Sequence, residues 1–125
     1  LPTALITGAS RGIGRRTAEL LAHQGWDLLL TARSADQLEQ VSAQLRSKVV
    51  SVASAAIDLT QSDGIAAAIA GLLQKGETPS VLINNAGAAY TGDLLAMPIE
   101  RWQWLLQLNL TSVMQVCSAV VPAMR

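Results

Sequence analysis

The sequence has 125 residues, which suits one domain, and half of them are hydrophobic, which excludes a disordered chain. Nine basic and nine acidic residues cancel, so neither nucleic acid nor a membrane surface is expected as a partner. A single cysteine, Cys117, excludes a disulfide framework, and no metal site is expected. We expect the Cys117 thiol to be buried and inert. No apolar run is expected to reach the roughly 20 residues of a membrane span. With no leader before the first strand, a cytoplasmic protein is expected.

The chain opens with a short apolar run, a glycine-rich turn and a helical pattern. Residues 4–6 are typical of a buried strand, and apolar residues within 15–23 recur at helical spacing. Between these segments lie Gly8, Gly12 and Gly14. The main-chain amides of such a turn, with the positive end of the helix that follows, form a cradle for phosphate. This setting favours a bound cofactor over a purely structural turn.

Strands and helices are expected to alternate along the rest of the chain. Further strands are expected at 26–31, 49–57 and 80–83, and further helices at 35–46, about 60–75 and 98–124. This βαβαβαβα order predicts one α/β domain over residues 1–125, a Rossmann-type doubly wound parallel sheet. Gly8, Arg33, Asp58 and residues 84–87 each follow a strand, at the edge where such sheets bind ligands.

Four segments, in order, resemble motifs of the classical short-chain dehydrogenase/reductase family: residues 7–14, 58–60, 84–87 and the helix asparagine Asn109. The resemblance implies that ten residues bind a dinucleotide: Gly8, Ser10, Gly12, Ile13, Gly14, Asp58, Leu59, Asn84, Ala86 and Gly87. It also implies a catalytic role for Asn109, which would kink its helix and order a water in a proton relay. From the residues alone, Asp58 and residues 84–85 could be turn formers, and Asn109 a satisfied polar group that pins the helix to the sheet.

The end of the second expected strand favours NADP(H) over NAD(H). An NAD site places an acid about 20 residues beyond the glycines, but residues 31–34 contain none. Arg33 can instead hold a 2′-phosphate with its guanidinium fork, and Arg11 lies in the turn facing it. Arg11, Arg15 and Arg16 form a basic cluster beside the glycine turn, and this cluster fits a solvated helix face and an anion about equally well.

The resemblance further implies an oxidoreductase that moves a hydride between NADP(H) and a small-molecule carbonyl or secondary alcohol. The family's Tyr-x-x-x-Lys pair is missing, because Tyr90 is the only tyrosine and Leu94 stands four residues after it. The chain is therefore expected to hold the cofactor half, to stop before a fifth strand and to be inactive alone.

Two other functions remain open. A catalytically silent dinucleotide-binding module, used as a sensor or an assembly scaffold, would explain the missing pair. A flavin- or S-adenosylmethionine-binding domain would leave residues 84–87 and Asn109 unexplained. The expected last helix has no charged residue between Trp102 and Met124, so it needs cover on several sides. A homo-oligomer, a dimer or tetramer formed through this helix, is therefore expected.

Overall fold

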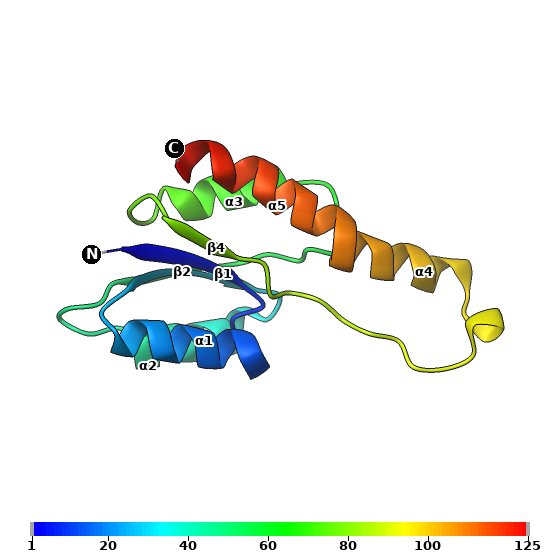
Figure 1. The fold of residues 1–125 in the computed structure, drawn as a ribbon, viewed down its shortest axis with the longest axis horizontal. Helices are drawn as coiled ribbons and strands as arrows, with labels where there is room; N and C mark the ends of the chain where they lie inside the picture. The colour runs from blue at the N-terminus through cyan, green and yellow to red at the C-terminus, as the bar shows by residue number, and fades with distance from the viewer. Residues whose placement is uncertain (1, 125) are drawn as a thin grey trace.

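The computed structural model describes residues 2–124 and shows a parallel sheet between two layers of helices (Figure 1). The strands are β1 (Thr3–Thr7), β2 (Asp27–Ala32), β3 (Val52–Ala56) and β4 (Val81–Ile83). Their spatial order is β3-β2-β1-β4, and Leu5 of β1 pairs with Leu29 on one side and Leu82 on the other. This order confirms the predicted doubly wound α/β fold.

Helices cover both faces of the sheet (Figure 1). One face is covered by α1 (Gly12–His23) and α2 (Ala35–Leu45) and the other by α3 (Ile65–Leu73) and α5 (Ser112–Val120), whereas α4 (Ile99–Leu106) extends past the carboxyl edge of the sheet (Figure 1). Since successive strand side chains alternate between faces, Ile6 packs with the α1 and α2 residues of one core. The neighbouring Leu5 packs with Ile69 of α3 and Val116 of α5 in the other core. Both faces are therefore buried, which explains the continuous apolar runs in the strands.

The last predicted helix is divided into segments. Pro98 precedes the first helical residue instead of being that residue, and α4 leads into a π-helical turn, Gln107–Thr111. This turn joins α5, which ends in a 3₁₀ turn, Val121–Met124. A π-helical turn inside an α-helix often marks a functional position, and this one contains Asn109.

Several predicted boundaries change in the structure. Helix α1 begins at Gly12, inside the glycine turn, instead of near residue 15. The predicted caps of α3, at 60, 62 or 63, are wrong, because the residue before this helix is Gly64 with φ of 86°. The predicted cap Ser34 is confirmed, since its side chain accepts from the backbone N–H of Gln37 at 3.4 Å.

The expectation that no segment reaches the length of a membrane span is wrong by length and composition. The helical segment Ile99–Met124 has 26 residues and contains a window of mean hydropathy 1.4. Only 22% of that window is buried, although a core helix of a soluble protein can pass the same test. Val116 and Val120 are fully buried against α3 and the sheet, whereas Leu106, Leu110 and Met114 are exposed.

Candidate cofactor-binding site

A cavity of about 540 Å³ lies at the carboxyl edge of the sheet. It is formed by the loops after all four strands together with one side of α4, at the point where β1 separates the two halves of the sheet. Its lining residues are Gly8, Ser10, Arg11, Gly12, Thr31, Ala32, Arg33, Ser34, Gln37, Ile57, Asp58, Leu59, Thr60, Asn85, Ala86, Gly87, Ala88, Trp104 and Leu108. The volume is within the range of ligand and cofactor sites.

The glycine turn packs so closely against the loop after β4 that side chains are excluded. A Cβ at Gly8, whose φ is 65°, would lie 2.8 Å from Asn85 Nδ2 and 3.0 Å from Ala86 Cα. A Cβ at Gly14 would overlap the carbonyl oxygen of Gly8 and the Asn85 amide. Gly12, with φ of 59°, lines the cavity, and within residues 2–124 a Cβ placed there would meet no atom within 4 Å beyond its chain neighbours and the adjacent backbone of its own helix. A ligand can therefore approach the main chain closely at Gly12.

Hydrogen bonds join the loop after β4 to the end of β1. The Thr7 hydroxyl oxygen accepts from the backbone N–H of Asn85 at 3.0 Å and from that of Ala86 at 2.9 Å. The Asn85 side chain donates from Nδ2 to the Gly8 carbonyl at 3.1 Å. Asn85 thus holds two walls of the cavity together. Sequence reasoning missed this residue, although it stands next to the predicted Asn84 in the same motif.

Asp58 both shapes a turn and lines the cavity. Its Oδ1 accepts from the Thr60 backbone N–H at 3.0 Å and from the Thr60 hydroxyl at 2.6 Å. The turn-former interpretation therefore holds, and it coexists with a place in the site. Leu59, next along the chain, is buried and packs in the second core.

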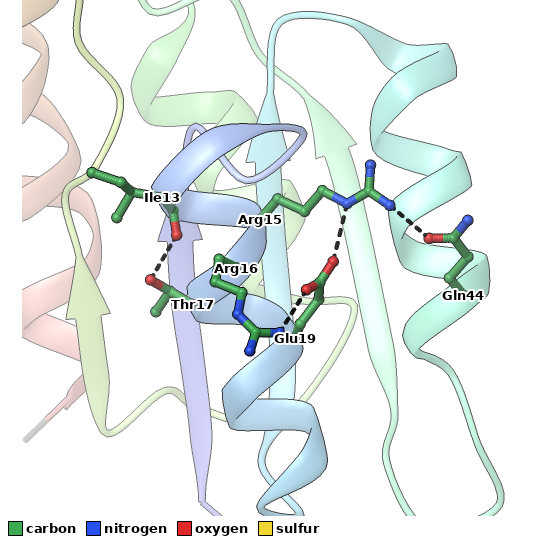
Figure 2. Close-up of polar contacts among 6 residues, drawn as sticks. All are labelled: Ile13, Arg15, Arg16, Thr17, Glu19 and Gln44. Atoms are coloured by element: carbon green, nitrogen blue, oxygen red, sulfur yellow. Dashed lines mark hydrogen bonds and ion pairs between the residues drawn. The ribbon is translucent and has the colours of Figure 1, made fainter.

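The predicted cluster of Arg11, Arg15 and Arg16 divides in the structure. Arg15 and Arg16 point along α1 toward Glu19, each at 3.2 Å, and Arg15 also donates to Gln44 of α2 at 3.0 Å (Figure 2). Hydrogen bonds from Arg16 and then Arg15 hold the pKa of the Glu19 carboxyl below its usual value. These two arginines thus form a solvated helix face, the more conservative of their two interpretations.

Arg11, the third member of the cluster, instead lines the cavity together with Arg33. Among residues 2–124 neither forms an ion pair. Arg11 follows β1 and Arg33 follows β2, adjacent parallel strands whose carboxyl ends share one edge. Two guanidinium groups that line one cavity without an ion-pair partner suit an anionic ligand.

Asn109 lies behind the loop after β4, outside the cavity lining. Its Oδ1 accepts from the Ala88 backbone N–H at 3.1 Å, and its Nδ2 donates to the Ala88 carbonyl at 2.8 Å and to the Leu105 carbonyl at 3.0 Å. A Cβ at Gly87 would lie 2.8 Å from the same Oδ1. The amide is satisfied, and it pins the helix to this loop instead of to the sheet itself.

Three other predicted residues also lie outside the lining. The Ile13 side chain is 80% exposed, Gly14 is buried beneath the turn, and Asn84 turns away to donate to Cys117 Sγ at 3.4 Å. That sulfur is half-buried instead of fully buried as expected. Residues 2–124 hold no cluster of three or more His, Cys, Asp or Glu side chains suited to a metal.

Sequence reasoning missed the contribution of α4 to the cavity. Trp104 lines it from this helix and Leu108 from the π-helical turn that follows, and Arg101 stacks on the Trp104 ring with 4.5 Å to the centroid. The two lining residues are four apart, which places them on one side of the helix. The same spacing is shared by many core positions, so it gave no signal of a ligand site.

Comparison with known proteins agrees with this geometry. A family model described as short chain dehydrogenase matches residues 2–125. Serine 3-dehydrogenase of Rhizobium radiobacter is 35% identical over 123 residues, which cover 98% of this chain and 48% of that protein. The chain thus spans about half the length of the curated relatives it matches.

Solved structures of similar proteins superpose closely. A short-chain dehydrogenase from Sphingobium yanoikuyae in complex with NADPH is 40% identical, with a TM-score of 0.87 over 98% of this chain and 48% of that one. An alcohol dehydrogenase from Thermococcus sibiricus complexed with 5-hydroxy-NADP is 31% identical, with a TM-score of 0.92 over 98% and 53%. By its motifs, fold and relatives, the chain belongs to the short-chain dehydrogenase family.

Proposed function

We propose that the cavity binds NADP(H) and that the protein is an oxidoreductase acting on a small-molecule carbonyl or secondary alcohol. The observation that carries this proposal is the meeting of residues from four separate loops in one cavity. Nine of the twelve expected cofactor residues line it: Gly8, Ser10, Arg11, Gly12, Arg33, Asp58, Leu59, Ala86 and Gly87. Related proteins with NADP or NADPH bound support the choice of cofactor.

The residues present fit such a group. The pyrophosphate would lie at the glycine turn, where α1 begins at Gly12 and has no acidic residue in its first turn. Asp58 and Leu59 would hold the adenine at one end, and Ala86 and Gly87 the riboses toward the other. When bound, the nicotinamide gives or accepts a hydride. The task of this chain's residues is to bind the dinucleotide, orient it and neutralise its charge.

Arg11 and Arg33 support NADP(H) over NAD(H), and titration calorimetry with NADPH and NADH tests this. We expect tighter binding of NADPH, and an Arg33→Ala variant that loses about 10- to 100-fold in NADPH affinity, as for a charge-assisted contact, with NADH affinity unchanged. Arg16→Ala is the matched control, since it removes an arginine bound to Glu19 on the same side of the sheet. If Arg33→Ala loses affinity for NADPH and NADH equally, or loses affinity for neither, the proposal is contradicted.

The catalytic step is proposed for the whole protein, with the Tyr-x-x-x-Lys pair outside these residues. Tyr90 stands in the loop after β4, and no lining position is a tyrosine or lysine. Residues 1–125 alone should therefore bind NADPH without oxidising it in the presence of a carbonyl. If the protein with its natural flanking sequence also binds NADPH but reduces none of a panel of ketones and aldehydes, the silent binding module becomes the better interpretation.

A second copy of the chain is proposed as the cover of the exposed apolar side of the last helix. Leu106, Leu110 and Met114 are each more than half exposed there. Leu110→Glu should shift sedimentation toward the monomer, whereas Leu20→Glu, an exposed leucine of α1, should not. Flotation of the chain with lipid vesicles would favour a membrane instead. The expected cytoplasmic location stays a prediction.

A further inference from the structure

The π-helical turn sends two amide side chains to two different walls of the cavity. Gln107 and Asn109 are two residues apart, so their side chains leave the helical segment in different directions. Asn109 binds Ala88 in the loop after β4, as described above. Gln107 turns the other way, and its Nε2 donates to the Leu59 carbonyl at 3.2 Å, in the loop after β3.

A second glutamine extends the contact with the loop after β3. Gln107 Nε2 also donates to Gln115 Oε1 at 2.9 Å, so the bond crosses from the π turn to α5. Gln115 Nε2 in turn donates to the Ser62 carbonyl at 3.1 Å and to the Ser62 hydroxyl at 3.0 Å. The two side chains therefore hold residues 59 and 62 with three hydrogen bonds.

These bonds act on the segment that carries Asp58. Within this segment, the Asp58 carboxylate and carbonyl accept from Thr60 and from the Gln61 N–H at 3.1 Å, which closes a local turn. Leu59 anchors this segment in the second core, against which Leu108 also packs. The two glutamines add hydrogen bonds that tie the segment to the π turn and to α5, so they help to set the gap between Asp58 on one side and Trp104 on the other.

We propose that Gln107, together with Gln115, is a positioning residue for the adenosine half of the dinucleotide. It lies outside the cavity lining and acts through the loop after β3. This inference rests on the proposed function, since it assumes that the adenosine lies between Asp58 and α4. Because Asn109 holds the other loop independently, loss of the Gln107 amide should loosen one wall of the cavity and leave the other in place.

The test uses Gln107→Met, which keeps the length of the side chain and removes both hydrogen bonds. Gln103→Met is the matched control, because Gln103 lies one turn earlier on α4, is exposed, and has no side-chain hydrogen bond within residues 2–124. Titration with 2′,5′-ADP, which carries only the adenosine half, should show about fivefold weaker binding for Gln107→Met, the loss of one or two neutral hydrogen bonds. Amide hydrogen exchange should become faster at residues 59–63 and stay unchanged at 86–90.

Each outcome decides between the two claims. If 2′,5′-ADP and NADPH both fail to bind the original chain, the proposed function and this inference fall together. If they bind and Gln107→Met matches Gln103→Met, or exchange rises equally in both segments, only the positioning role is refuted. If Gln107→Met does not fold, Gln115→Met is the deciding variant. We expect the same loss of 2′,5′-ADP affinity, and faster amide hydrogen exchange only at residues 59–63.

Discussion

Replacing Gly14 by alanine should damage the turn and the loop beside it at once. Gly14 is buried, and its new Cβ would overlap the Gly8 carbonyl oxygen and the Asn85 amide, with the Gly8 carbonyl carbon at 2.9 Å. Relieving that overlap costs about 1–3 kcal/mol, and the displaced hydrogen bond between Asn85 and Gly8 about 1 kcal/mol. The better helix propensity of alanine returns about 1 kcal/mol. The net loss is therefore about 1–3 kcal/mol, or about 4–12 °C in melting temperature for a chain of this size.

Gly71→Ala is the control that separates the cost of the steric overlap at Gly14 from the gain in helix propensity of alanine over glycine. Gly71 is an exposed glycine inside α3, and in the described part of the chain a Cβ placed on it would meet no atom within 4 Å beyond its chain neighbours and the adjacent backbone of its own helix. This variant should gain about 1 kcal/mol and melt above the original protein. Thermal denaturation followed by circular dichroism measures both variants, and calorimetry with NADPH should show the Gly14 variant at least tenfold weaker. If Gly14→Ala melts at or above Gly71→Ala, the close packing of the turn is refuted.

Two further substitutions test the remaining contacts. Asn85→Ala removes the hydrogen bond to the Gly8 carbonyl and should lower the free energy of unfolding, measured by chemical denaturation, by about 1–2 kcal/mol and the NADPH affinity several-fold. If both quantities are unchanged, this hydrogen bond is dispensable. Glu19→Gln should destabilise the protein near neutral pH, because Arg16 and Arg15 depress the pKa of the folded carboxyl, so its stabilisation exists above the unfolded pKa. That difference should shrink as pH falls from about 5 to about 2 in pH-dependent melts, and a difference independent of pH would contradict the assignment.

The sequence predicted the strand order in the chain, the parallel sheet and the edge at which ligands bind. These features follow from local patterns, because short apolar runs alternate with helical ones and polar or glycine residues follow each strand. Arg33 and Asp58 could be assigned from the sequence alone to the carboxyl edge of the sheet, because parallel strands end at the same edge. The start of α3 was missed because Gly64 adopts a left-handed conformation that competes with capping by the polar residues before it.

Only the tertiary structure decided which side chains within the motifs face the cavity. Asn84 and Asn85 are chemically identical neighbours, yet the first turns to Cys117 and the second braces the glycine turn. Likewise, Arg11 remains at the cavity while Arg15 and Arg16 are held by Glu19. The direction of a side chain depends on long-range packing and pairing, which spacing along the chain does not encode. Residue type and order determined this fold, whereas the contacts between distant segments determined the role of each residue in the site.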